Sequence, residues 1–263
     1  MAVLSRDQLE SFAERGYTYL RGAFSPELAL RIQDEIWGEL AAEHGIERDD
    51  RTTWSTPTCS PRKTKLSATA HEAANETFQE AASELIGDDD WKRPATWGGF
   101  LVTFPNAPAG TAWDVPKEIW HWDGPPGGRG LLIFSFVSSV PPAGGGTLVV
   151  EGSHRLVDDY YRSLSTAERA EPHKKHRKRF SAWHPWLAAL TGRGDPVDDR
   201  VAEFCDRTTS VHDVDVRVVE LTDEPGDVVF CNLGLVHASN PNHADEPRMM
   251  RVKFLLLDES ARV

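Results

Sequence analysis

The second part of the chain, from Trp97 onward, constrains the fold more than any other feature. Short runs rich in β-branched and aromatic residues alternate there with glycine, proline, asparagine and aspartate, which is typical of a sandwich or barrel. Eight such runs predict the eight strands of a jelly roll, in a mainly β protein with flanking helices. We expect these strands near residues 97–104, 117–123, 131–139, 146–151, 215–221, 227–231, 234–239 and 249–257.

The first 95 residues predict helices instead. Ser5 and Gln8 form a capping-box pattern at the start of a helix over residues 4–15. The pair Ser25-Pro26 is a strong signal for the start of a second helix, because proline suits the first helical position. A third helix is expected over residues 71–86. We therefore expect a helical N-terminal region before the strands.

A long segment, residues 155–214, interrupts the strands and is too long for an ordinary hairpin loop. Helix-like patterns at 166–178 and 183–190 predict a partly helical insertion. The chain length of 263 residues fits one large domain. The expected plan is a single domain over 1–263, with a mainly helical entry at 1–95, a jelly-roll core at 96–154 and 215–258, and the insertion at 155–214.

Charge and cysteine content exclude some classes of function. The net charge of −12 argues against nucleic acid as a partner, because a phosphate backbone repels such a surface. Three widely separated cysteines predict neither a zinc ribbon nor a disulfide scaffold, and they favour a reducing compartment. The sequence contains no run of about 18 apolar residues, the length that a membrane span needs. We therefore expect a cytoplasmic protein without a membrane partner.

The stretch Trp120-His121-Trp122-Asp123 places an imidazole and a carboxylate two residues apart. In an extended segment, alternate side chains share a face, so His121 and Asp123 would point one way and the tryptophans the other. An imidazole and a carboxylate on one face are two of the three ligands of a typical site for a divalent first-row metal. Alone, this pattern is weak, because such a pair is more often a surface loop or a hydrogen-bonded pair.

A third candidate ligand, His237, ends a short apolar strand that follows a Pro-Gly-Asp turn and a buried strand. The position predicts the mouth of a barrel rather than its interior. Together with His121 and Asp123 it completes the two-histidine, one-carboxylate triad of non-haem Fe(II) oxygenases. Three protein ligands leave three positions of an octahedral ion free, which suffices for a chelating 2-oxo acid and for O₂.

A 2-oxo acid with a distal carboxylate also needs a cation at a fixed distance. Arg248 would return close to the metal if its strand ran antiparallel to the strand that ends at His237, and its guanidinium could bind a carboxylate through two hydrogen bonds. Ser239 shares a face with His237 and could join that site. Arg251 is three residues further, so it must face the opposite side from Arg248; a surface position is expected for it.

The insertion contains a run of basic residues in an otherwise acidic protein: His173-Lys174-Lys175-His176-Arg177-Lys178-Arg179, called here the basic segment. A solvated helix face is its ordinary explanation, and a docking patch for an acidic or carrier-tethered molecule is the functional alternative. Lys63 and Lys65 present the same choice between solvent and an anionic ligand.

These features together resemble the phytanoyl-CoA dioxygenase (PhyH) family of Fe(II)- and 2-oxoglutarate-dependent oxygenases. The motifs that carry the resemblance span most of the chain in the family's order. They are the N-terminal Phe12…Gly16-Tyr17…Leu20…Gly22-Ala23-Phe24, His121-Trp122-Asp123, the run Gly146 to His154, the Pro225-Gly226-Asp227 strand, and His237-x-Ser239 with Arg248.

The resemblance implies a double-stranded β-helix with iron at its mouth, and Fe(II), 2-oxoglutarate and O₂ as cofactor and co-substrates. It implies that His121, Asp123 and His237 bind iron and that Arg248 and Ser239 hold the distal carboxylate of 2-oxoglutarate. Thr103, on the strand before the metal-ligand pair, is a further candidate for contact with 2-oxoglutarate.

Other implications of the resemblance concern the reaction and the surroundings of the site. His154 matches a supporting position rather than a ligand. Related halogenases replace the carboxylate with a small residue, so Asp123 implies hydroxylation or another C–H oxidation. The insertion is expected to act as a lid. Trp122 and Glu151 depart from the family's pattern, because a smaller or polar residue and a proline are usual there.

The expected substrate is a small-molecule metabolite, such as one from a biosynthetic pathway, because the acidic chain does not favour nucleic acid. The oligomeric state and the position oxidised stay open. A non-catalytic jelly-roll protein that binds a metal or ligand is the competing class. A cupin-type enzyme is disfavoured, since the His-x-His and glutamate spacing is absent.

Overall fold

The larger of two antiparallel sheets has six strands. The computed structural model describes residues 2–87, 91–124 and 129–257. The strand order is β1-β9-β4-β11-β3-β2. The bounds are β1 Tyr17–Leu20, β2 Thr58–Cys59, β3 Gly99–Thr103, β4 Gly130–Phe136, β9 Val228–Asn232 and β11 Arg248–Leu256. Neighbouring strands of this sheet are far apart in sequence. The entry strand β1 forms one edge of the sheet, where it pairs with β9.

The smaller sheet has three strands in the order β10-β5-β8, and a separate hairpin pairs β6 with β7. Their bounds are β5 Leu148–Val150, β6 Thr209–Val211, β7 Val214–Val216, β8 Val218–Glu220 and β10 His237–Ala238. In β10, His237 pairs with Val149. The candidate ligand His237 therefore belongs to the smaller sheet.

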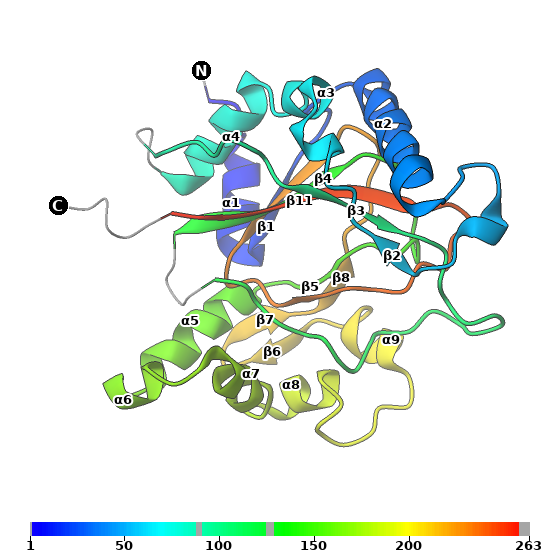
Figure 1. The fold of residues 1–263 in the computed structure, drawn as a ribbon. Helices are drawn as coiled ribbons and strands as arrows, with labels where there is room; N and C mark the ends of the chain where they lie inside the picture. The colour runs from blue at the N-terminus through cyan, green and yellow to red at the C-terminus, as the bar shows by residue number, and fades with distance from the viewer. Residues whose placement is uncertain (1, 88–90, 125–128, 258–263) are drawn as a thin grey trace.

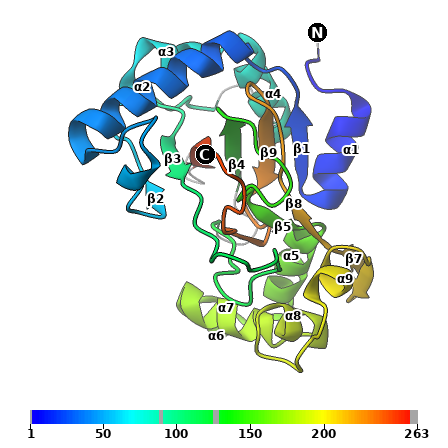
Figure 2. The ribbon, with the colours of Figure 1, turned by 90° about the vertical axis from the view of Figure 1, so that its right-hand side faces the viewer.

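Two groups of helices flank the sheets, one at each end of the molecule (Figures 1 and 2). The first group is α1 Arg6–Arg15, α2 Pro26–His44, α3 Ala68–Glu72 and α4 Glu76–Ile86, with the 3-10 turns η1 Arg51–Thr53 and η2 Thr64–Leu66. The second group is α5 Ser153–Ser163, α6 Thr166–Arg169, α7 His173–Ser181, α8 Pro185–Leu190 and α9 Arg200–Phe204. The predicted capping box at Ser5 and the Ser25-Pro26 helix start are both present.

The alternation of β4 explains the layers. Leu131 and Ile133 pack into the cluster that contains α2, α3 and α4. Leu132 and Phe134, which point the other way, pack with Val149 of the smaller sheet. Both faces of the central strand are therefore buried, one under helices and one under a second sheet.

The helices of the insertion build a core of their own. Residues of α5, α7 and α8 pack there with the outer face of β5 and with the segment before the metal-ligand pair. This core is continuous with the smaller sheet. The insertion is thus packed against the sheet that carries His237.

Three expectations need correction. The described chain is a mixture of helix and antiparallel sheet with more helix than strand, rather than mainly β. Residues 117–123 form no strand; only His121 makes an isolated bridge, because Ile119 has a left-handed backbone with φ +64° that breaks the extended run. The helix expected over 166–178 is two helices, α6 and α7, separated at Pro172.

Among the described residues, no helix combines the length and the apolar character that crossing a bilayer requires.

Candidate metal centre

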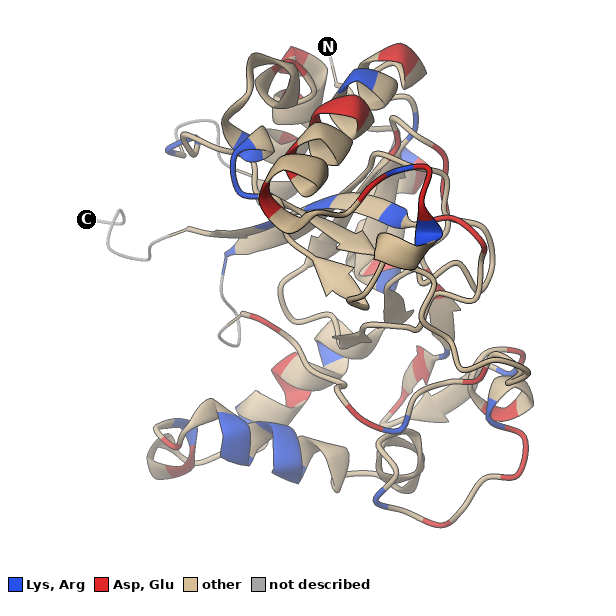
Figure 3. Cartoon of the chain, turned by 45° about the vertical axis from the view of Figure 1, so that its right-hand side comes forward, with Lys and Arg blue, Asp and Glu red and all other residues tan. Residues whose placement is uncertain are grey.

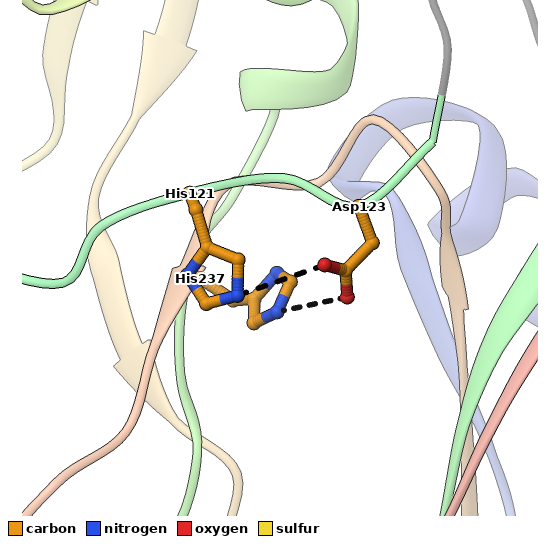
Figure 4. A group of neighbouring side chains, drawn as sticks. All are labelled: His121, Asp123 and His237. Atoms are coloured by element: carbon orange, nitrogen blue, oxygen red, sulfur yellow. Dashed lines mark ion pairs between the residues drawn. The ribbon is translucent and has the colours of Figure 1, made fainter. Parts of the chain in front are cut away.

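His121, Asp123 and His237 lie together, with their ligand atoms all within 4.8 Å of one another (Figure 4). Asp123 Oδ1 is 3.7 Å from His121 Nε2, and Asp123 Oδ2 is 3.4 Å from His237 Nε2. Two imidazole nitrogens and one carboxylate facing a common point are the donor set of a facial-triad metal site. His237 is the most buried of the three, with 8% of its side chain exposed against 31% for each of the others.

The backbone fixes the tautomer of both histidines in the same way. His121 Nδ1 lies 2.7 Å from the carbonyl oxygen of Ile119, and His237 Nδ1 lies 2.9 Å from that of Leu235. A carbonyl oxygen can only accept, so each Nδ1 carries the hydrogen and donates it. Each Nε2 then faces the carboxylate and is the ring nitrogen left to bind a metal ion.

Protonation states at the site also suit a metal. Burial, helped by the nearby His237, lowers the pKa of His121 and favours the neutral ring. The contact with His237 lowers the pKa of Asp123, against the opposing effect of burial, and favours the carboxylate. A neutral imidazole and an ionised carboxylate are the forms that bind a metal ion.

Two hydrogen bonds between backbones hold the two histidines in register. The His121 N–H donates to the His237 carbonyl at 3.0 Å, and the His237 N–H donates to the His121 carbonyl at 2.7 Å. The bridge joins residues 120–124, called here the ligand loop, to β10. Ligands 116 positions apart in sequence are therefore paired directly, although only one of them lies in a strand.

Trp122 points away from the metal ligands and is 1% exposed. Its ring makes edge contacts with His173 and Phe180 of α7, at centroid distances of 5.0 and 5.2 Å, and with Tyr161 of α5 at 6.3 Å. The residue between the two ligands is therefore a core residue of the insertion. Its departure from the family's pattern has a packing reason.

We expect Trp122→Ala to lower the free energy of unfolding by about 3–5 kcal/mol, because the large ring leaves a cavity among α5 and α7. Urea unfolding of the metal-free protein measures this effect. Trp120→Ala is the matched control, since Trp120 is only half-buried and should cost clearly less. Equal losses for the two variants would contradict the packing role given to Trp122.

Thr103, Ser239 and Arg248 line one cavity of about 650 Å³ beside the metal ligands. Arg248 pairs directly with Thr103 across β11 and β3, and its Nη2 donates to Thr103 Oγ1 at 2.9 Å. Its Nη1 donates to the Gly145 carbonyl, while its Nε is buried without an acceptor. Ile119, next to the ligand loop, lies on the cavity's rim. The predicted carboxylate-binding residues are thus brought to one cavity.

The charge of Arg248 has no counterion within ion-pair distance among the described residues. Burial lowers its pKa to about 10, and Glu220 acts in the opposite direction. A buried guanidinium without a paired carboxylate is costly, so an anion in the cavity would find a strong binding partner. Glu220 itself accepts from the N–H groups of Ala143 and Gly146 and shapes the loop that carries Gly145.

Arg251 faces the opposite side of β11, as its odd spacing from Arg248 predicted. It is 2% exposed, so the expected surface position was wrong. Its Nη1 donates to the Ala70 carbonyl at 2.7 Å, and its guanidinium lies over the Phe78 ring. Helices α3 and α4 cover this face of the sheet, which is why the side chain is buried.

Other residues singled out by the sequence lie outside the metal cluster. His154 Nε2 is 3.0 Å from the Ala13 carbonyl, so it links α5 to α1. Glu151 accepts from the Tyr17 hydroxyl and from Arg217, and it joins the entry strand to the smaller sheet. Lys63 forms an ion pair with Glu43 at the surface.

Sequence reasoning missed two residues around the site. Glu220 follows the buried Val218 and the half-buried Val219, and no pattern distinguished it from a surface glutamate. Arg177 was grouped with its basic neighbours, yet its Nη2 donates to the Trp122 carbonyl at 3.1 Å. The spacing of His173 and Arg177, four residues apart on one helix face, is the signal that would have separated them from the rest.

Comparison with known proteins gives one family and several similar structures. The family model described as phytanoyl-CoA dioxygenase (PhyH) matches residues 12–250. An ectoine dioxygenase from Sphingopyxis alaskensis is 24% identical over 268 residues, which cover 94% of this chain and 74% of that protein.

Two solved structures show the same fold at low identity. The non-heme alpha ketoglutarate dependent carbocyclase SnoK from nogalamycin biosynthesis has a TM-score of 0.57 and 17% identity, covering 98% of this chain and 86% of that one. The epimerase SnoN, solved with Fe³⁺, alpha ketoglutarate and nogalamycin RO, has a TM-score of 0.53 and 18% identity, covering 96% and 82%. These likenesses extend over nearly the whole chain.

Proposed function

Because the chain belongs to the phytanoyl-CoA dioxygenase (PhyH) family, we propose that it is an Fe(II)- and 2-oxoglutarate-dependent dioxygenase that oxidises a C–H bond of a small-molecule metabolite. The observation that carries this proposal is the convergence of His121, Asp123 and His237 beside a cavity that contains Arg248. A structural metal site would need only the three ligands. A co-substrate with two carboxylates also requires a cation such as Arg248 beside them.

The residues of the site have separate tasks in this proposal. His121, Asp123 and His237 hold Fe(II) and offset one of its two charges. Arg248, with Thr103 and Ser239, binds the distal carboxylate of 2-oxoglutarate and so fixes the other end of the molecule over the metal. Bound iron would supply the activation of O₂, coupled to decarboxylation of 2-oxoglutarate.

Asp123 supports C–H oxidation such as hydroxylation rather than halogenation. A halogenase of this kind needs a free coordination position where the carboxylate stands, and here the carboxylate faces both histidines. The structural neighbours include a carbocyclase and an epimerase. The proposal therefore covers oxidation of a C–H bond and leaves the later fate of the product to experiment.

The double-stranded β-helix and the lid belong to the same proposal. Two facing antiparallel sheets, with His237 at a strand end, support the double-stranded β-helix. For the lid, the helices of residues 155–214 pack against the ligand loop through Trp122, the residue between His121 and Asp123. A segment at that place can exclude water from the reaction.

The test is anaerobic addition of Fe(II) and 2-oxoglutarate to the metal-free protein. We expect a weak visible charge-transfer band, and succinate release once air and a substrate from a metabolite panel are added. Chelation of the metal should abolish both signals. A protein that binds metal but gives neither band nor succinate would instead be a non-catalytic binding protein.

A further inference from the structure

We propose, on the basis of the proposed function, that Arg177 of α7 binds an anionic oxygen group of the substrate, a carboxylate or a phosphate, beside the metal. Basic residues colour much of α7 in the lower part of the molecule (Figure 3). The contacts of Arg177 distinguish it from the rest of the basic segment. The site would lie on the insertion side of the ligand loop, away from the cavity that holds Arg248.

The charges of α7 divide by helix face. Lys175 and Arg179 both form ion pairs with Glu171, at 3.7 and 2.7 Å. Arg177 lies on the opposite face of the helix, which turns toward the ligand loop, and within the described ranges no carboxylate comes within ion-pair distance of it. Glu171 therefore offsets charge on Lys175 and Arg179, whereas among the described residues no carboxylate pairs with Arg177.

The guanidinium of Arg177 is held in place but not saturated. Its Nη2 donates to the carbonyl of Trp122, the residue between two metal ligands, at 3.1 Å. Its Nε is buried and finds no acceptor. One helical turn earlier, His173 Nε2 is also buried without a partner. A guanidinium donor and an imidazole nitrogen thus lie on one face, beside the ligand loop, without a partner.

A positive charge at this position needs a reason, because it opposes a metal ion nearby. It lies beside the ligands, since its Nη2 donates to the carbonyl of Trp122, the residue between His121 and Asp123. A neutral glutamine could donate the same bond to the Trp122 carbonyl. An anionic group that arrives with the substrate would offset the charge, accept from the unused donors and be oriented toward the metal.

The experiment measures binding rather than turnover. Anaerobic protein with Fe(II) and 2-oxoglutarate is titrated with small carboxylic acids, with their methyl esters and with phosphate monoesters, and affinity is followed by calorimetry and by changes in the charge-transfer band. Arg177→Gln keeps an amide donor and removes the charge, Arg177→Lys keeps the charge, and Arg179→Gln is the matched control on the outer face. The metal-free proteins are titrated with inorganic phosphate in parallel.

We expect the wild type to prefer acids or phosphates over the neutral esters. Arg177→Gln should weaken binding of the anions by about 10- to 100-fold and leave ester binding unchanged, because one charge-assisted bond is lost. Lysine should restore part of the difference, and Arg179→Gln should match the wild type.

Two results would overturn the assignment. One is unchanged anion affinity in Arg177→Gln, with phosphate as well as with the acids. The other is a loss of Fe(II) affinity in the same variant, which would show that Arg177 positions the ligand loop; removing a cation should otherwise leave metal affinity equal or higher. Failure of the proposed function appears separately, as absence of the band in the wild type, and the phosphate titration still tests Arg177 in that case.

Discussion

Asp123→Gly is expected to abolish succinate formation and to weaken Fe(II) binding by more than about 100-fold. Loss of a partner outside the coordination sphere of a metal typically costs 10- to 100-fold in affinity, and Asp123 is proposed as a direct ligand. The substitution also removes the only carboxylate of the cluster, so the remaining histidines would offset none of the metal's charge. Calorimetric titration with Fe(II) under argon measures the first effect, and succinate assays measure the second.

The control for this experiment is His154→Ala. His154 contacts the Ala13 carbonyl of helix α1 and lies outside the metal cluster. The variant should lower stability and leave Fe(II) affinity unchanged. An Asp123→Gly protein that retained the wild-type rate and metal affinity would remove Asp123 from the ligand set.

Arg248→Met should raise the KM for 2-oxoglutarate by at least about 30-fold, because loss of a buried charged partner of a carboxylate costs roughly 2–5 kcal/mol. The affinity for Fe(II) alone should not change, since Arg248 contacts Thr103 and Gly145 rather than the metal ligands. Titration of the charge-transfer band with 2-oxoglutarate gives the affinity without turnover.

Arg251→Met is an unusually close control for Arg248→Met. Both arginines lie on β11, both are buried, and burial lowers the pKa of each to about 10. Arg251 donates to the Ala70 carbonyl of α3 on the opposite face, so its loss should lower stability without affecting the binding of 2-oxoglutarate. The assignment of Arg248 fails if the two variants shift the KM equally.

The sequence predicted which side chains share a face more accurately than it predicted where the strands begin and end. Odd spacing placed Arg248 and Arg251 on opposite faces, and even spacing placed His121 with Asp123 and Trp120 with Trp122. These relations survive because they depend only on a locally extended backbone. They hold at His121 although residues 117–123 are not a strand.

Features that depend on packing between distant segments were not predictable. The burial of Arg251 requires α3 and α4 to lie on that face of the sheet, and nothing in the local sequence specifies this. The contact of Arg177 with Trp122 joins two segments 55 residues apart. The left-handed Ile119 was also missed, because a β-branched residue normally favours extended backbone.

The carbonyl contacts of the two histidines have a consequence for the entropy of metal binding. Each ring is held by the carbonyl of the residue two positions before it, so rotamer and tautomer are selected by the chain's nearest backbone rather than by a distant carboxylate. Less side-chain freedom then remains to be lost when an ion arrives. Because the same short arrangement occurs on both sides of the His121–His237 bridge, the two halves of the binding site are preorganised independently of each other.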